Sequence, residues 1–200
     1  MTRLLLVRHA AAASEVGRYW GSTDHPLSEA GREQARRLAS RLAGVPLVAT
    51  YASDLRRAAE TAALALGGRD LPIDLRPELR ELDFGLCEGL TYTEAVNCYP
   101  ETRGFWSADD LELVLPSGES LGALVARVDQ FLRALRELGR EDSVLVVAHA
   151  GPLRVLLCRC LGFDPRRNWQ FRLDHASLSD LDLQPECAIL ELLNDTCHLR

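Results

Sequence analysis

The 200-residue sequence contains no lysine, because all 23 of its basic residues are arginine. Enzymes that form a Schiff base, bind pyridoxal phosphate or hold nucleotide phosphates in a P-loop need a lysine amine, so these classes are excluded. Arginine instead offers a planar fork of donors that suits phosphate and carboxylate groups. The net charge of -6 argues against a nucleic-acid partner, so we expect any anion to meet a local arginine cluster.

Long apolar runs and metal motifs are also missing. No stretch approaches the ~20 apolar residues of a membrane span, and the first apolar run, Leu4–Val7, is too short for a signal peptide. We therefore expect a cytoplasmic protein with no membrane partner. The six cysteines form no CxxC pair and no zinc-type spacing with histidine, so we expect core thiols, no metal and no cofactor.

Two short apolar runs each end at a histidine. Leu4–Val7 is followed by Arg8 and His9, and Val144–Ala148 is followed by His149. Such runs are typical of buried parallel strands, whose carboxyl ends form the ligand-binding edge of an open α/β sheet. A single histidine at such a position could simply satisfy a neighbouring carbonyl group. Two histidines, one of them beside an arginine, predict a shared pocket.

The rest of the chain alternates between helical and strand patterns. Helices are predicted at 28–44, 56–66, 121–138 and 152–161, and further strands at 46–52, 71–75, 178–183 and 188–193. This alternation predicts one α/β domain, residues 1–200, with a helical insertion at about 91–115 that covers the active site. The last two strands have the pattern of edge strands, which is compatible with a homodimer.

Two helix starts are candidate anion sites. Arg57 lies in the first turn of the helix predicted at 56–66, where its charge opposes the helix dipole. A bound anion would explain this arginine, and a solvated side chain is the alternative. The helix after His149 begins close to Ala150, so its free N–H groups would also favour a phosphate.

Two loops could complete the site. The loop at 79–89 carries Glu81, Asp83 and Glu88, each of which could act as a general acid beside a phosphate, and the pattern does not choose among them. The loop at 17–26 is rich in turn-forming residues and could line a substrate pocket. Its candidate substrate contacts are Tyr19, Trp20 and Thr23, and surface packing of the two aromatic side chains is the alternative.

Five motifs occur in the order seen in the histidine phosphatase superfamily, whose members are also called phosphoglycerate mutase-like. They are Leu6-Val7-Arg8-His9, Ser53-x-Leu55-x-Arg57-Ala58, Glu81-x-x-Phe84-Gly85-x-x-Glu88-Gly89, Pro116-x-Gly118-Glu119-Ser120 and Val147-Ala148-His149-x-Gly151. The chain therefore resembles this superfamily over positions 4–154, with a similar layout in its tail. The resemblance implies a three-layer α/β/α sandwich with a mostly parallel central sheet and an edge antiparallel strand.

The resemblance also implies roles for individual residues. His9 would be the nucleophile that becomes a phosphohistidine, Glu81 would be the proton donor, and His149 would assist catalysis. The phosphate-binding residues would be Arg8, Arg57, His149 and Ala150. This chemistry is coherent, because neutral imidazole, with an ordinary pKa near ~6.5, is a competent nucleophile and cationic donors stabilise the transferred phosphoryl group.

The first loop departs from the family pattern. Ala10 stands where the family usually has glycine, Ala12 where it has threonine or serine, and Glu15 where it has asparagine. We therefore expect fewer side-chain contacts to phosphate from this loop, and a backbone at position 10 that tolerates a Cβ atom. His175 and His198 lie in no motif and are given no role.

The expected substrate is a small phosphorylated molecule. The segment at 19–27 resembles that of the α-ribazole phosphatases of cobalamin biosynthesis, which implies hydrolysis of α-ribazole 5'-phosphate to α-ribazole. The first alternative is a phosphatase of broad small-molecule or sugar phosphates, or a phosphoglycerate mutase-type enzyme. The second is a non-catalytic module that binds a phospho-ligand, since the altered first loop is where catalysis would decay.

Overall fold

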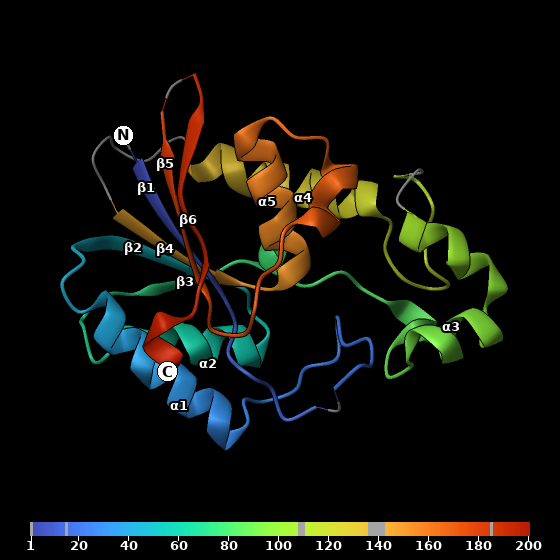
Figure 1. Cartoon of the computed structure of the whole chain (residues 1–200), viewed down its shortest axis with the longest axis horizontal. Coiled ribbons are helices and arrows are strands. Elements are labelled where there is room, and N and C mark those ends of the chain that lie inside the picture. The colour runs from blue at the N-terminus through green and yellow to red at the C-terminus, as the bar shows by residue number, and fades with distance from the viewer. Residues whose placement is uncertain (1, 15, 108–110, 136–142, 185) are drawn as a thin grey trace.

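The computed structural model describes residues 2–14, 16–107, 111–135, 143–184 and 186–200, and within them the central element is a six-stranded sheet of order β3-β2-β4-β1-β5-β6 (Figure 1). The strands are β1 (Thr2–Arg8), β2 (Leu47–Ala52), β3 (Ile73–Leu75), β4 (Ser143–Ala148), β5 (Leu178–Leu183) and β6 (Ala188–Asp195). The first four are mutually parallel, whereas β5 pairs antiparallel with both β1 and β6. The predicted sheet, mostly parallel with an edge strand in antiparallel pairing, is confirmed.

The two apolar runs that end at histidines form the middle of the sheet. β1 and β4 are neighbours, paired from Leu4 opposite Val144 to Val7 opposite Val147, and these four side chains are fully buried. Continuous burial follows because helices cover both faces of a parallel sheet. The shared register brings the carboxyl ends of the two strands together.

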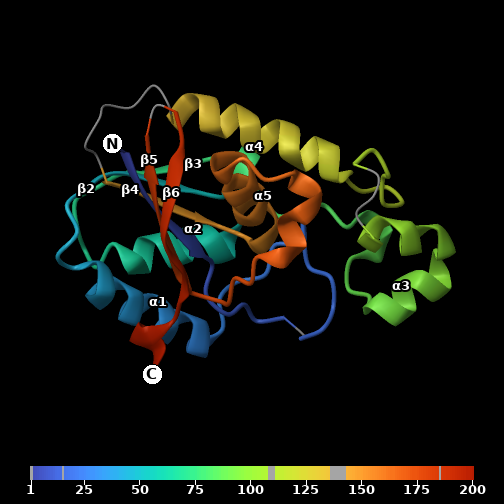
Figure 2. The ribbon, with the colours of Figure 1, turned by 45° about the horizontal axis from the view of Figure 1, so that its top comes forward.

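Helices form the two outer layers (Figures 1 and 2). The helices α1 (Glu29–Leu42) and α2 (Arg56–Ala65) cover one face, and α4 (Leu121–Leu135) and α5 (Ala150–Leu161) cover the other. Successive residues of a strand point to opposite faces, so Leu5 packs in the core under α1 and α2 while Leu4 and Leu6 pack in the core under α4 and α5. The predicted three-layer sandwich is therefore confirmed.

The predicted element ends need small corrections. Ser28 caps α1 as expected, because its side chain accepts a hydrogen bond from the Gly31 N–H group. Helix α5 begins at Ala150, two residues earlier than predicted, since His149 already has the extended backbone of an N-cap. Strand β3 begins at Ile73, two residues later than predicted. The predicted helix end at 138 lies outside the described residues.

The described residues of the stretch at 91–115, which are 91–107 and 111–115, are largely helical and lie to one side of the sheet (Figure 2). They contain α3 (Tyr92–Cys98), which begins with a capping box of Thr91 and Glu94, and a 3-10 helix at Pro100–Ser107. The other 3-10 helices are Pro77–Leu79, Gly85–Cys87, Pro165–Gln170 and Cys197–Leu199. The single-domain boundary and the covering role of this insertion stay predictions.

Strand β6 forms one edge of the sheet. β6 pairs with β5 on one side only, and its exposed side chains include Ile189 and Leu193. A single chain does not test the expected homodimer, which stays a prediction. In the part of the chain that the structure describes, no helix combines the length and the apolar character that a membrane crossing needs.

Candidate active site

The two predicted histidines meet at the carboxyl ends of β1 and β4. The ring centroids of His9 and His149 are 4.9 Å apart, with the ring planes inclined by 58°. The backbone N–H group of His9 donates to the Ala148 carbonyl at 2.8 Å, which continues the pairing of the two strands by one residue. His9 is 6% exposed and His149 is fully buried. The tertiary structure therefore brings the two histidines together, as the sequence predicted.

The hydrogen bond of the His9 ring defines its tautomer. Its Nδ1 atom lies 2.8 Å from the Ala10 carbonyl oxygen, which can only accept, so Nδ1 carries the proton and Nε2 keeps a free lone pair. Burial lowers the pKa of His9 well below its ordinary value of 6.5, and the positive charges of Arg57 and Arg8 lower it further. At neutral pH this imidazole is therefore uncharged.

His149 is held by Arg57 and Ser53. The Arg57 Nε–H group donates to His149 Nδ1 at 3.2 Å, so Nε2 carries the proton and donates to the Ser53 hydroxyl at 2.9 Å. Burial, the nearby His9 and Arg57 keep the pKa of His149 well below 6.5. His149 is therefore a neutral, fixed partner of His9.

Arg57 is 2% exposed, although its guanidinium makes no ion pair with any carboxylate in the described residues. Its two terminal nitrogens donate to the backbone carbonyls of Thr23 at 2.8 Å and Gly21 at 2.6 Å. Thr23 thus contributes a backbone carbonyl, while its hydroxyl donates to Glu88. A buried guanidinium without a counter-ion is favourable only where an anion can approach.

Arg8 is the second arginine at the site. Its Nη1 atom donates to the Leu173 carbonyl at 2.7 Å and its Nη2 atom to His175 Nε2 at 3.0 Å, while its Nε–H group is buried without a partner in the described residues. His175, to which the sequence assigned no role, lies with its ring centroid 5.2 Å from that of His9. That assignment needs correction, because His175 is part of the site.

The direction of β5 explains why sequence reasoning missed His175. An antiparallel neighbour of β1 starts where β1 ends, so the residues just before Leu178 must lie beside the end of β1. The place of His175 could therefore be predicted only from the antiparallel pairing of β1 and β5, and a single sequence specifies strand pairing weakly.

The structure separates the three carboxylates of the loop at 79–89. Glu81 lines the cavity together with Arg8 and Ala150, and its carboxylate accepts the N–H groups of Gly151 at 3.0 Å and Leu82 at 2.9 Å. The other two carboxylates hold loops in place.

Glu88 accepts the N–H groups of Gly21 at 2.8 Å and Ser22 at 3.0 Å, and Asp83 accepts the Ser22 hydroxyl and the Gly85 N–H group. Both are committed to backbone and loop contacts. Glu81 is the carboxylate that faces the cavity.

A cavity of about 200 Å³ lies beside Glu81. Its aromatic lining consists of Tyr19, Trp20, Phe84, Phe105 and Trp169. Tyr19 stacks on Phe84 with 4.9 Å between ring centroids, and Trp20 makes an edge contact with His25 at 4.5 Å. The two predicted substrate-loop aromatics are therefore at the cavity. In the part of the chain that is described, no three His, Cys, Asp or Glu side chains group to hold a metal ion.

Arg154 also lines the cavity and was missed by sequence reasoning. Its Nε–H group donates to the Phe171 carbonyl at 2.7 Å, and its guanidinium carbon lies 5.7 Å from the Trp169 ring centroid. Its position in the sequence could have indicated this, because Arg154 follows Ala150 by four residues and so lies on the same face of α5.

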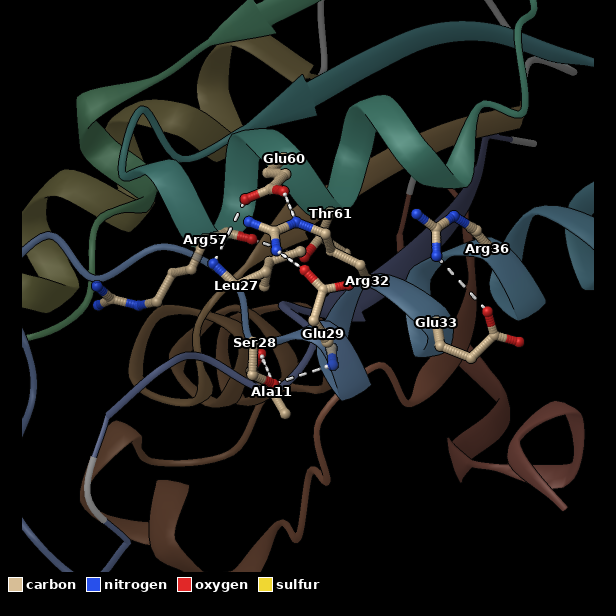
Figure 3. Close-up of polar contacts among 11 residues, drawn as sticks. Ala11, Leu27, Ser28, Glu29, Arg32, Glu33, Arg36, Arg57, Glu60 and Thr61 are labelled. Atoms are coloured by element: carbon tan, nitrogen blue, oxygen red, sulfur yellow. Dashed lines mark hydrogen bonds and ion pairs between the residues drawn. The ribbon is translucent and has the colours of Figure 1, made fainter.

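The altered first loop is supported by α1 and α2. Ala10 is fully buried outside the left-handed backbone region, and its N–H group donates to Thr61 Oγ1 at 3.0 Å, so its Cβ atom is tolerated. Figure 3 shows the neighbouring contacts, in which Ser28 donates twice to the Ala11 carbonyl. Ala12 forms an isolated bridge with Leu27. The expected departure at Glu15 lies outside the described residues.

Comparisons with known proteins agree with this geometry. The family model of the histidine phosphatase superfamily (branch 1) matches residues 4–196. Phosphoserine phosphatase 1 of Hydrogenobacter thermophilus is 35% identical over 200 residues, which cover 100% of this chain and 95% of that protein. The adenosylcobalamin/alpha-ribazole phosphatase of Escherichia coli is 34% identical over 193 residues, with 96% and 95% covered.

A solved structure shows the same fold. The crystal structure of the alpha-ribazole phosphatase from Shigella flexneri superposes with a TM-score of 0.88 at 34% identity, covering 96% of each chain. The family match spans nearly the whole sequence, and the relatives align from end to end. The chain belongs to the histidine phosphatase superfamily.

Proposed function

We propose that this phosphatase hydrolyses α-ribazole 5'-phosphate to α-ribazole through a phosphohistidine at His9. Its family and its relatives make the chain a phosphoric monoester hydrolase, and the proposal concerns the residues and the substrate. The observation that carries the chemical step is the hydrogen bond from His9 Nδ1 to the Ala10 carbonyl. It leaves the Nε2 lone pair to attack phosphorus.

Two arginines that form no ion pair with a carboxylate in the described residues would bind the transferred phosphoryl group. Arg8 and Arg57 are each held by backbone carbonyls and by a histidine whose ring lies beside that of His9. The first turn of α5 adds the backbone of Ala150. Phosphoryl transfer spreads negative charge over three oxygens, so these preorganised cations would stabilise its transition state.

Glu81 would move the proton. The bond from the substrate oxygen to phosphorus breaks as His9 Nε2 bonds to phosphorus, and the Glu81 carboxyl group gives its proton to the departing oxygen. The resulting carboxylate then takes a proton from the water that attacks the phosphohistidine. That second transfer returns both Glu81 and His9 to their starting states and releases inorganic phosphate.

The aromatic lining of the cavity supports α-ribazole 5'-phosphate as the proposed substrate. Stacking surfaces such as Trp20 and Trp169 suit a ribose phosphate that bears a flat aromatic base, as α-ribazole does. The relative from Escherichia coli is named as an adenosylcobalamin/alpha-ribazole phosphatase.

Phosphoserine is the second candidate substrate. Arg154 faces the cavity and makes no ion pair with any carboxylate in the described residues, so its fork could bind the carboxylate of phosphoserine. The relative from Hydrogenobacter thermophilus is named as a phosphoserine phosphatase.

A substrate panel tests the proposal. We would measure kcat/KM for α-ribazole 5'-phosphate, phosphoserine, 3-phosphoglycerate and fructose 6-phosphate, with His9→Ala as the inactive control. We expect α-ribazole 5'-phosphate to lead phosphoserine by at least about tenfold. A preference for phosphoserine that Arg154→Met abolishes would favour the second candidate. No turnover of any phosphomonoester would favour the non-catalytic phospho-ligand module instead.

A further inference from the structure

The segment at 173–176, which leads into β5, contacts both Arg8 and His9. The Ala176 N–H group donates to the carbonyls of Arg8 at 3.0 Å and His9 at 3.2 Å. The Leu173 carbonyl accepts from Arg8 Nη1 at 2.7 Å. This part of the tail therefore supports the end of β1 from the side opposite to β4.

His175 lies at the centre of this segment. Its Nε2 atom is 3.0 Å from Arg8 Nη2, and because a guanidinium only donates, Nε2 must carry a lone pair and Nδ1 the proton. Burial and the charge of Arg8 lower the pKa of His175 to about 4. At neutral pH the imidazole is therefore neutral, and its Nε2 lone pair is available to accept from Arg8.

The donors of Arg8 divide into two groups. Nη1 and Nη2 each use one N–H on the tail, at Leu173 and His175, which fixes the plane of the guanidinium. The Nε–H group is buried and has no partner in the described residues. An unpaired buried donor is costly unless a ligand satisfies it, so Nε–H is the donor left for a phosphoryl oxygen.

We propose that His175 is a positioning residue, whose Nε2 atom holds the guanidinium of Arg8 in the orientation that binds the phosphoryl group. It acts through Arg8 and needs no contact of its own with the substrate. The proposal deepens the proposed function at the same site, but it depends only on phosphate binding and not on the identity of the organic group.

The end of β6 fixes the residue before His175. Asn194 accepts the Asp174 N–H group at 2.6 Å through its side-chain oxygen and donates to the Asp174 carboxylate at 2.9 Å. The Asn194 N–H group in turn donates to the Ser179 hydroxyl at 3.0 Å. The antiparallel strands of the tail thus hold His175 against Arg8, so the tail completes the phosphate site.

Two substitutions separate this role from a general effect on folding. Glutamine can place its amide oxygen near the position of Nε2, so His175→Gln keeps an acceptor for Arg8. His175→Phe keeps a ring of similar size but has no acceptor. His198→Phe is the matched control, because the His198 Nε2–H group donates to the Ala176 carbonyl of the same segment, and no hydrogen bond joins His198 to Arg8 or His9 in the described residues.

The measurements are KM and kcat with p-nitrophenyl phosphate, the inhibition constant of inorganic phosphate, and Tm for each variant. We expect His175→Phe to raise both KM and the inhibition constant by about tenfold, the effect of one hydrogen bond to a charged group, with a smaller change in kcat. His175→Gln should stay within about threefold of the parent protein, and His198→Phe should match it.

Three results would overturn the proposal. They are unchanged phosphate inhibition in His175→Phe, equal losses in His175→Phe and His175→Gln, and the same loss in His198→Phe. If His175→Phe is too unstable to assay, phosphate inhibition of His175→Leu at low temperature decides the question in the same way. Because inorganic phosphate is the probe, a wrong choice of organic substrate leaves this test intact.

Discussion

The backbone N–H group of Gly151 donates to the carboxylate of Glu81 at 3.0 Å and so ties the first turn of α5 to the loop at 79–89. The approach is so close that a Cβ atom at position 151 would lie 2.2 Å from Glu81 Oε1. A Cβ atom at position 151 would therefore displace the Glu81 carboxylate, the proposed proton donor, from its place. The same contact holds the carboxylate beside the cavity, where a departing oxygen would need a proton.

Gly151→Ala should displace Glu81 and leave the phosphate site in place. We expect kcat to fall by about 100-fold with alkyl phosphomonoesters, whose leaving group needs a proton, and far less with p-nitrophenyl phosphate. Steady-state kinetics with both substrates measures the difference. Gly44→Ala is the control, since a Cβ atom there meets nothing within 4 Å. Equal losses on both substrates would contradict a proton-donor role for Glu81.

The tautomer of His9 predicts which nitrogen becomes phosphorylated. Because Nδ1 donates to the Ala10 carbonyl, the phosphoryl group should attach to Nε2. Rapid quenching in alkali, where phosphohistidine survives, followed by phosphorus and nitrogen NMR of the unfolded protein, distinguishes the two nitrogens. His9→Ala supplies the unlabelled control. Phosphate on Nδ1 would contradict this tautomer, and phosphate on another histidine would contradict His9 as the nucleophile.

The pH profile of kcat/KM should report the lowered pKa of His9. Catalysis needs the neutral imidazole, and burial, Arg57 and Arg8 all disfavour its protonation, with His149 and His175 as the neighbouring rings. We therefore expect kcat/KM to stay within about twofold between pH 7.5 and pH 6, where an ordinary histidine would already lose most of its neutral form. Assays should use a substrate whose own ionisation is known. A loss centred near pH 6.5 would contradict the buried neutral nucleophile.

Stability should depend on pH through the same histidines. His9, His149 and His175 have lower pKa values in the folded chain than when unfolded, so below pH 6.5 the unfolded chain binds more protons. The free energy of unfolding should be highest above pH 6.5 and fall as the pH falls, by up to about 1.4 kcal/mol per pH unit for each histidine.

Urea unfolding at pH 5, 6 and 7 measures this slope. For His175 the window runs from 6.5 down to about 4, so His175→Phe should make the slope between pH 6 and pH 5 shallower by about one proton. An unchanged slope in that variant would mean that His175 is protonated in the folded chain.

Arg127 should be needed to hold the Glu81 loop. It pairs with Glu119 at 2.8 Å, with side-chain exposures of 19% and 16%, and it donates to the backbone carbonyls of Glu78 at 2.7 Å and Glu81 at 3.1 Å. Arg127→Met removes the guanidinium donors from Glu119 and from these carbonyls. We expect a loss of about 2–3 kcal/mol in the free energy of unfolding and a lower kcat.

Chemical denaturation of Arg127→Met and Arg133→Met tests this expectation. Arg133 is an exposed arginine on the same helix, α4, so its substitution should change stability by less than about 0.5 kcal/mol. Equal stability of the two variants would remove the proposed support of the Glu81 loop.

The sequence by itself determined the central sheet and most of the site. Continuous burial requires apolar runs such as Leu4–Val7, so β1 and β4 can be predicted from hydrophobicity alone, and the histidine that follows each run is visible in the sequence. The order of the family motifs then indicated Arg57 as a phosphate-binding residue and Glu81 as the proton donor. Helix ends were less certain, as the start of α5 shows, because an N-cap such as His149 is defined by backbone geometry rather than by residue type.

Only the tertiary structure decided which side chains share the pocket. His175 reaches Arg8 because β5 runs antiparallel to β1, and Arg154 faces the cavity because α5 begins beside β4. The tertiary structure also separated Glu81 from Glu88, since which carboxylate faces the cavity and which one holds a loop depends on how distant loops fold together. Hydrophobic periodicity acts over a few residues and is written in the chain. Contacts between residues more than a hundred positions apart arise only from strand order and direction.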